Sequence, residues 1–252
     1  MKKTVLILAA ALLALVACDK EKVPQMADCY RVQGKAIQSA TLTYAAGRTF
    51  DITLTWGKKG QLVGYKYVSE GETTSMAFSY MKDGVVVTHT MSDEVDSFSQ
   101  QFDLLFAAGY VSQILTVMDD GYQVEYVFEN GHLRSKLFPG ASGPEIYTWN
   151  GDCLTQYSVP NGPTYYYTYG DQPAKGGISA FLYDYPSVDD YVGSYLNGFN
   201  GISKLPTKIE YQSSPDGVRV VKSTLTYETD ADGYVTRMTE QPSGSVWTFS
   251  YE

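Results

Sequence analysis

The sequence predicts an all-β fold: a large antiparallel meander of repeated hairpins, with about 14–16 strands, closed or flattened into a barrel. Three observations lead to this prediction. Apolar and polar residues alternate along many short segments, which places every other side chain on one face of a strand. Gly beside a polar residue separates these segments, as short hairpin loops require. The chain also contains 22 Tyr and 10 Phe, and aromatic residues favour the half-buried surface of a pleated sheet.

The stretch 124–137 shows this device most clearly. Val124, Tyr126 and Phe128 alternate with other residues and so share one strand face. Asn130-Gly131 follows, and Asn-Gly supplies the two positive φ angles of a tight type I′ turn. We therefore expect a two-stranded hairpin here.

The first 17 residues predict a lipoprotein signal peptide. The pair Lys2-Lys3 forms a positive n-region, and the apolar run 5–15 is too short to span a bilayer comfortably. Leu15-Val16-Ala17-Cys18 then meets polar residues and resembles a bacterial lipobox, in which the Cys18 thiol receives a diacylglyceryl group. An ordinary secretory signal with a chance cysteine is the alternative. We expect an outer-membrane lipoprotein of the bacterial envelope, held by acyl chains on Cys18 and facing either the periplasm or the cell surface.

The rest of the chain divides into two parts. Residues 18–38 contain Pro24 and no clear period, which predicts a lipidated tether; residues 39–252 form a single barrel-like domain. The formal charge of the whole chain is −9, and loss of the leader removes two lysines. An acidic surface repels phosphate backbones, so we expect no nucleic-acid partner.

Two cysteines remain in the mature chain after lipidation. Cys29 and Cys153 could form a disulfide in an oxidising envelope. Two free buried thiols are the alternative, and the sequence leaves both open because it does not give the separation of the residues.

The predicted strands follow one another between Gly-containing turns. In the first half they cover 41–44, 50–56, 62–68, 75–80, 85–91, 102–106 and 110–118, with a polar interruption at 92–101 that we expect to be a longer loop. In the second half they cover 124–129, 132–137, 146–149, 154–159, 165–169, 208–211, 218–227, 234–239 and 246–251. The irregular zone 170–205 contains a short helix near 187–197, because Ser187 is an N-cap candidate followed by acidic residues.

An aromatic residue precedes each of eight turns at a nearly regular interval. These residues are Trp56, Tyr80, Phe106, Phe128, Trp149, Tyr169, Tyr227 and Tyr251. Apart from the interrupted interval before Tyr227, they recur roughly every 20–26 residues, which indicates one repeated supersecondary unit. Lone hairpins are marginal in water, so the units must share a sheet.

The repeated aromatic-x-aromatic pattern, the lipobox, Leu205-Pro206-Thr207-Lys208-Ile209 and Asp230-Ala-Asp-Gly-Tyr-Val-Thr236 together resemble an uncharacterised Bacteroidetes lipoprotein family. That family is described as having a porin-like fold, so the resemblance implies a large antiparallel barrel over residues 40–252 and no known activity. A weaker likeness links the units to the Tyr-Asp repeats of toxin-encasing shell proteins, since the repeats here lack a strict length.

The strands favour a barrel that stands in water over one that crosses a membrane. A spanning barrel needs strands of about 9 to 11 residues with an apolar outer band. Several strands predicted here are shorter, and many of their faces carry Thr, Glu or Lys. We therefore expect the apolar stripe to face inward.

No catalytic constellation or metal site is predicted. A Gly-x-Ser-x-Gly elbow is absent, and neither His89 nor His132 has a second ligand at strand or helix spacing. Asp230 and Asp232 resemble the start of a calcium loop, but the later ligands are missing, which favours turn chemistry. We expect no cofactor.

One alternative is a glycoside hydrolase that uses the carboxylates of the 184–190 region. Asp184, Asp189 and Asp190 cluster beside tyrosines, and paired carboxylates hydrolyse glycosides at a suitable separation. A solvated loop with a helix N-terminus explains the same residues more simply.

The run of tyrosines at 165–169 is the candidate binding surface. Tyr165, Tyr167 and Tyr169 share one strand face, and Tyr166 lies on the other. An exposed face would suit sugar or peptide contacts, whereas a buried one serves cross-strand aromatic packing. The leading hypothesis is a non-enzymatic scaffold that binds or presents a glycan or an envelope protein; a purely structural envelope component is a further alternative.

Overall fold

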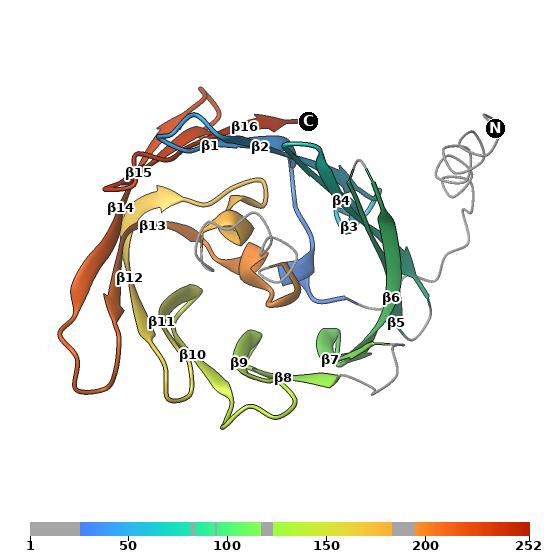
Figure 1. Ribbon diagram of the computed structural model, residues 1–252. Helices are drawn as coiled ribbons and strands as arrows, with labels where there is room; N and C mark the ends of the chain where they lie inside the picture. Colours follow the sequence, from blue (N-terminus) through green and yellow to red (C-terminus); the bar gives the residue numbers. More distant parts are fainter. Residues whose placement is uncertain (1–25, 82–83, 94, 117–122, 183–194) are drawn as a thin grey trace.

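The computed structural model describes residues 26–81, 84–93, 95–116, 123–182 and 195–252 (Figure 1). This part of the chain forms a closed antiparallel barrel in which each strand pairs with its neighbours in sequence and β1 pairs with β16. The predicted all-β barrel is confirmed. The strands are β1 (Ile37–Thr43), β2 (Thr49–Trp56), β3 (Leu62–Ser69), β4 (Glu72–Tyr80), β5 (Gly84–Ser92), β6 (Ser97–Ala107), β7 (Tyr110–Thr116), β8 (Gln123–Glu129), β9 (His132–Leu137), β10 (Glu145–Asn150), β11 (Cys153–Ser158), β12 (Thr164–Pro173), β13 (Lys204–Gln212), β14 (Val220–Thr229), β15 (Val235–Gln241) and β16 (Val246–Tyr251).

Short 3-10 turns accompany the strands: η2 (Asp28–Tyr30), η3 (Ile178–Phe181) and η5 (Phe199–Gly201). The helix expected near 187–197 falls mostly on residues 183–194, which lie outside the described residues. Of its predicted span, Tyr195 and Leu196 are helical, and a turn follows them. Among the described residues, no helix has the length and apolar character needed to cross a membrane.

The strands turn their apolar faces inward and their polar faces outward. In β16, Trp247 and Phe249 are buried between the exposed Thr248 and Ser250. Outward side chains bond across strands, as between the hydroxyls of Ser39 and Ser250 at 2.7 Å. A lipid-facing barrel would instead carry an apolar outer band. The inward-facing apolar stripe expected from the sequence is confirmed, and the outer face is mostly polar.

The hairpin turns have the predicted chemistry. Asn130 and Gly131 have φ angles of 52° and 87°, the pair of positive values that a type I′ turn requires. The same pairing of positive angles recurs at Ala108 and Gly109. These turns join β8 to β9 and β6 to β7 at the same end of the barrel, which we call the plugged end.

Two segments fold into the barrel at the plugged end and lie inside the ring of strands (Figure 1). The N-terminal strap comprises residues 26–36, and the inner loop comprises residues 174–182 and 195–203 between β12 and β13. The backbone N–H of Ala27 donates to Gly109 at 2.9 Å, that of Val32 to Gly60 at 2.9 Å, and that of Ala36 to Glu252 at 3.0 Å. The strap thus runs across the end of the barrel from the β6–β7 turn to the end of β16.

The strap differs from the sequence-based expectation for residues 18–38. The tether was expected to become ordered near Cys29, and Met26 and Tyr30 are buried there; the difference is at its end, because β1 already begins at Ile37 and not after residue 38. Period-two alternation could not reveal this, because the strap is irregular and is buried by strands distant in sequence. In the described chain, everything from Met26 onward belongs to the barrel.

The eight aromatic residues before the turns all lie where even-numbered strands reach the plugged end. We call them the terminal aromatic ring. Six of them donate a hydroxyl or indole hydrogen bond of 2.6 to 2.8 Å to a backbone carbonyl of the preceding strand: Trp56 to Ile37, Tyr80 to Leu62, Trp149 to Leu133, Tyr169 to Leu154, Tyr227 to Pro206 and Tyr251 to Val235. The repeat seen in the sequence is therefore a repeated cross-strand bond.

Register shifts accompany the ring. The pairing slips between Thr55 and Trp56, between Thr148 and Trp149, and at three further ring positions, Phe106, Phe128 and Tyr169. A bulge bends a strand, increases its twist and changes the direction of a side chain. The bulges thus coincide with several ring positions but not with every ring hydrogen bond, since Tyr80 donates to Leu62 without a register shift.

The ring members that cannot donate, Phe106 and Phe128, pack against the strap instead. Both rings pack edge-to-face with the Tyr30 ring, and their centroids lie 5.9 and 6.4 Å from the centroid of Tyr30. Tyr30 supplies the hydroxyl that the two phenylalanines lack. This hydroxyl donates to the Leu196 carbonyl at 3.1 Å and accepts from the Val111 N–H at 3.2 Å. Burial raises the pKa of Tyr30 well above its ordinary value, so the hydroxyl keeps its proton.

The inner loop and the strap also hold each other. The Tyr195 hydroxyl donates to the carbonyl of Tyr30 at 2.8 Å and accepts from the N–H of Leu62 at 3.1 Å. Burial raises the pKa of Tyr195 to about 12. Strap, inner loop and barrel wall therefore meet at one fully buried hydroxyl.

The expected loop at 92–101 is wrong over most of its length. β6 begins at Ser97 and pairs with β5 as far as Ser92. Several side chains in this extension are exposed, including Ser97, Phe98 and Ser99. A strand that is solvated on both faces shows no apolar alternation, which explains why the sequence pattern missed it.

We expect Tyr227→Phe to lower the free energy of unfolding by about 1–2 kcal/mol, because the Pro206 carbonyl loses its donor in a buried setting. Urea unfolding followed by tryptophan fluorescence measures this. The matched control is Tyr166→Phe, whose hydroxyl donates to the Gln212 side chain on the outer face. For this control we expect the free energy of unfolding to fall by less than about 0.5 kcal/mol. An equal fall in both variants would contradict the stabilising role of the ring.

Candidate binding site

Four tyrosines on adjacent strands form a ladder on the inner wall. Tyr147, Tyr157, Tyr165 and Tyr211 belong to β10, β11, β12 and β13 and are direct cross-strand partners. Ring centroids are 5.0, 5.7 and 5.5 Å apart along the series. Tyr147 also contacts Phe199 of the inner loop, which places this face of the four strands inside the barrel.

Charged side chains border this tyrosine ladder. Lys136 of β9 pairs directly with Glu145 of β10, and the Tyr147 hydroxyl donates to Glu145 at 3.0 Å. The Lys136 ammonium lies 4.6 Å from the ring centre of Phe138, and the Lys222 ammonium lies 4.5 Å from that of Tyr165. The wall thus offers both signs of charge beside aromatic surface.

The inward faces divide into a buried half and a partly exposed half. Near the plugged end, inward residues pack against the strap and the inner loop and are buried. Toward the opposite end, which we call the far end, Tyr157, Tyr165 and Tyr211 are only partly buried. Solvent therefore reaches the far part of the inner wall.

Apolar side chains on β5 and β6 are also accessible to solvent at the far end. Met91 and Phe98 pair with each other and continue the inward faces of β5 and β6 beyond the buried Val87 and Leu104. Their exposed fractions are 47% and 45%. Because the two side chains are adjacent and accessible, this part of the inner wall is a candidate binding surface.

The three tyrosines proposed from the sequence share the inner face, but they have different roles. Tyr165 belongs to the ladder, Tyr167 is buried with 7% exposed, and Tyr169 belongs to the terminal aromatic ring. Tyr166 lies on the outer face, where the Arg219 guanidinium is 3.4 Å from its ring centre. Alternation along the strand was therefore sufficient to divide the four residues between the two faces.

Sequence reasoning missed Tyr147, Tyr157, Tyr211, Lys136 and Glu145. They are spread over four strands, β9, β10, β11 and β13, and only the cross-strand register brings them beside Tyr165. The sequence suggested sugar or peptide contacts with exposed tyrosine rings. In the ladder, both faces of the Tyr157 ring are covered by its neighbours Tyr147 and Tyr165. The wall therefore presents ring edges and bordering polar groups, and not open ring faces.

The two histidines have structural surroundings. His89 stacks on Phe102 at 6.0 Å and shares a 3.2 Å hydrogen bond with Gln100, and burial lowers its pKa. His132 stacks on Trp149 at 4.5 Å, with its Nε2 atom 3.7 Å from Asp152. Within the described ranges, no three His, Cys, Asp or Glu residues are grouped so that they could hold a metal ion.

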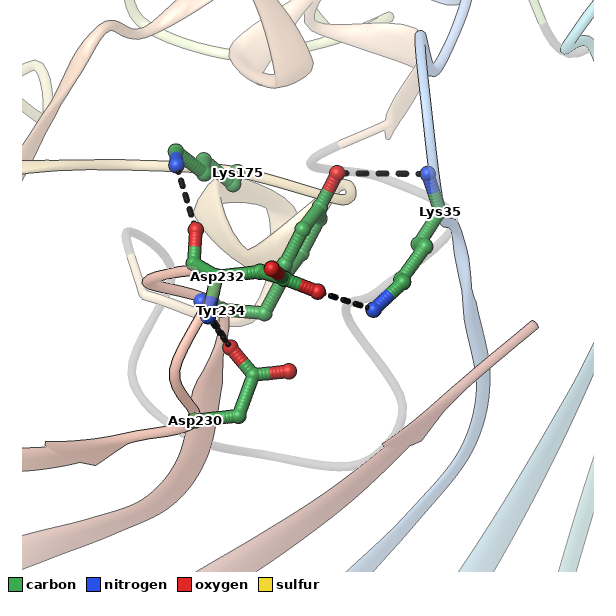
Figure 2. Close-up of polar contacts among 5 residues, drawn as sticks. All are labelled: Lys35, Lys175, Asp230, Asp232 and Tyr234. Atoms are coloured by element: carbon green, nitrogen blue, oxygen red, sulfur yellow. Dashed lines mark hydrogen bonds and ion pairs between the residues drawn. The ribbon is translucent and has the colours of Figure 1, made fainter.

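A latch joins the strap and the inner loop to the β14–β15 turn (Figure 2). The Lys35 ammonium bonds the Asp232 carboxylate at 2.5 Å, and the Lys175 ammonium donates to the Asp232 carbonyl at 2.7 Å. Both ammonium groups lie 5.4 Å from the ring centre of Tyr234. Asp230 accepts the backbone N–H groups of Asp232 and Tyr234 at 2.9 Å. The Asp230 carboxylate thus performs the turn chemistry favoured by the sequence, whereas the Asp232 carboxylate holds the strap through Lys35.

The two cysteines in the described part of the chain, Cys29 and Cys153, are free thiols. Cys29 lies in the strap against Gly198 and Gly201, where an added Cβ would meet its atoms at 3.0 Å. Cys153 begins β11, and its thiol interacts with Ser203 and Lys204. Of the two alternatives left open by the sequence, the structure has separate thiols.

The predicted hydrolase residues Asp184, Asp189 and Asp190 lie outside the described residues, as does Cys18. Their roles remain predictions.

Fold and site together define the class: an internally plugged β-barrel with a polar outer face and a partly exposed aromatic inner wall. A porin-like protein from Bacteroides vulgatus has a similar structure, with a TM-score of 0.54, 14% identity, and coverage of 86% of this chain and 99% of that protein. A porin-like protein from Bacteroides uniformis aligns at a TM-score of 0.40 and 15% identity over 86% of this chain and 96% of its own. No protein-family model and no curated protein matches the sequence. The first likeness establishes the porin-like fold, and fold alone does not define function.

We expect Asp232→Asn to loosen the strap. Asp232 has a pKa lowered by the hydrogen bond from Lys35, so its contribution is present at neutral pH and is lost as pH falls through the folded-state pKa. Backbone hydrogen exchange should accelerate over residues 31–37 at pH 7. The control is Asp171→Asn, which removes an exposed pair with Lys204 at 3.4 Å and should leave the strap unchanged. Unchanged exchange in both variants would show that the latch does not hold the strap.

We expect Cys29 to resist alkylation in the folded protein. Burial raises its thiol pKa to about 12, and the thiolate is the reactive form. In a Cys18→Ser chain at pH 8, iodoacetamide should modify Cys153 first and Cys29 only after guanidinium unfolding. Peptide mass spectrometry distinguishes the sites; rapid labelling of Cys29 in the folded chain would contradict this placement.

Proposed function

We propose that this protein is a lipoprotein of the bacterial envelope, anchored through Cys18, and that it acts as a non-enzymatic binding scaffold. The observation that carries the proposal is the accessibility of the inner wall: large aromatic and apolar side chains face inward at the far end and remain partly exposed. A stability role alone would favour burying them, as at the plugged end.

The chemistry of the wall favours a glycan as the ligand. Ring edges and apolar groups suit the C–H surfaces of a sugar, and tyrosine hydroxyls with Lys136, Glu145 and Lys222 suit its hydroxyls. An envelope protein is the second candidate ligand. The outer face supports anchoring from outside the bilayer, because most of its exposed positions are polar, with Val68 and Val127 as exposed apolar exceptions.

A glycan array probed with the purified mature chain tests the proposal, followed by calorimetry with the strongest binder. Tyr157→Ala should weaken binding at least tenfold, about 1.4 kcal/mol, because it interrupts the ladder. The matched control is Tyr166→Ala, from the outer face of the adjacent strand, which should bind as the parent does. Tyr157→Phe keeps the stack and isolates the hydroxyl.

The outcomes separate the candidates. Equal weakening by Tyr157→Ala and Tyr166→Ala would exclude the inner wall as the site. An empty array together with a stoichiometric protein partner in pull-downs would favour the structural role and contradict glycan binding.

A further inference from the structure

We propose that the plugged end of the barrel rests against the lipid surface and that the far end, with its accessible inner wall, faces away from it. The inference depends on the proposed anchor at Cys18. It adds an interaction surface, the plugged end, and a partner of defined chemistry, the bilayer to which the acyl chains belong.

The first argument is the position at which the described chain begins. Met26 is 4% exposed, and the neighbouring Ala27 bonds the Gly109 carbonyl in the β6–β7 turn. That turn lies at the plugged end. The chain leading to Cys18 therefore starts from this end of the barrel, however the intervening residues are arranged.

The second argument compares two lengths. Seven residues, 19–25, separate Cys18 from the fixed position of Met26. A flexible chain of the corresponding eight Cα–Cα steps spans on average roughly 16 Å, with a limit of roughly 28 Å. β12 has 10 residues and runs between the two ends, which at an ordinary strand tilt gives a barrel height of roughly 25 Å. To put the far end on the bilayer, the tether would have to run almost fully extended along the wall.

The third argument is the shape of the two ends. At the plugged end the connections β6–β7, β8–β9 and β10–β11 each contain only two residues. At the far end the connections β9–β10 and β13–β14 contain seven residues each. Longer connections also occur at the plugged end, with five residues each in β2–β3 and β14–β15, and the far end has a two-residue β3–β4 turn. This argument therefore depends on the two seven-residue loops, which add height at the far end.

The strap and the inner loop already fill the plugged end, so a bilayer there would not obstruct the inner wall. A ligand would approach from the far end, opposite the anchor. Lipid attachment and ligand binding therefore use opposite ends of one barrel and do not compete.

The test is energy transfer from single labelled cysteines to an acceptor lipid in phosphatidylcholine vesicles, using the full-length, natively lipidated protein. Lys59→Cys and Asp152→Cys place probes in plugged-end turns, and Ala46→Cys and Asp216→Cys place matched probes in exposed far-end turns. All carry Cys153→Ser, and the buried Cys29 stays in place. We expect more efficient transfer from both plugged-end probes, corresponding to a height difference of roughly 25 Å.

Equal or reversed transfer in acylated protein would overturn this inference and leave the proposed anchor and glycan binding intact. Mass spectrometry of the N-terminal peptide reports acylation separately. A chain without acyl groups on Cys18 would refute the anchor and this orientation together. Calorimetry with the array-selected glycan, on free and vesicle-bound protein, should give equal affinity, and a loss on vesicles would place the far end at the lipid surface.

Discussion

The fold depends on a repeated hydrogen bond at one end of the barrel. A ring side chain at the end of an even strand donates to a carbonyl of the preceding strand, and a register shift often accompanies it. An unpaired carbonyl in a buried setting costs about 1–3 kcal/mol. The ring satisfies these carbonyls and also supplies large apolar surface. It therefore closes the end of each hairpin while it seals the core.

The strap and the inner loop add further buried hydrogen bonds and packing to those of the terminal aromatic ring. Where two ring members are phenylalanines, Tyr30 enters from the strap with the hydroxyl that they lack. Tyr195 then joins the inner loop to the strap and to β3. Because these segments bury the inward faces at the plugged end, the barrel has a packed core there. Resemblance to porin-like proteins is thus a likeness of strand architecture, combined here with a filled end and a polar exterior.

The inward aromatic residues fall into two groups that differ in burial. Near the plug they are buried and bonded, so they contribute mainly to stability. Near the far end the tyrosine ladder and the Met91–Phe98 pair keep partial exposure, with charged groups beside them. The boundary between the two is set by how far the strap and the inner loop extend, and the proposed site begins where they stop.

The sequence by itself determined the fold class, the type I′ turns, the alternation of faces at residues 165–169 and the eight aromatic positions of the ring. These features are local: period two and turn chemistry depend on neighbouring residues along the chain. Only the tertiary structure decided that residues 26–36 cross the barrel, that residues 174–182 and 195–203 fold inside it, and that four tyrosines stand together: Tyr147, Tyr157, Tyr165 and Tyr211. Each of those facts depends on cross-strand register or on burial by distant segments, and a single chain pattern carries no record of which residues become neighbours when a barrel closes.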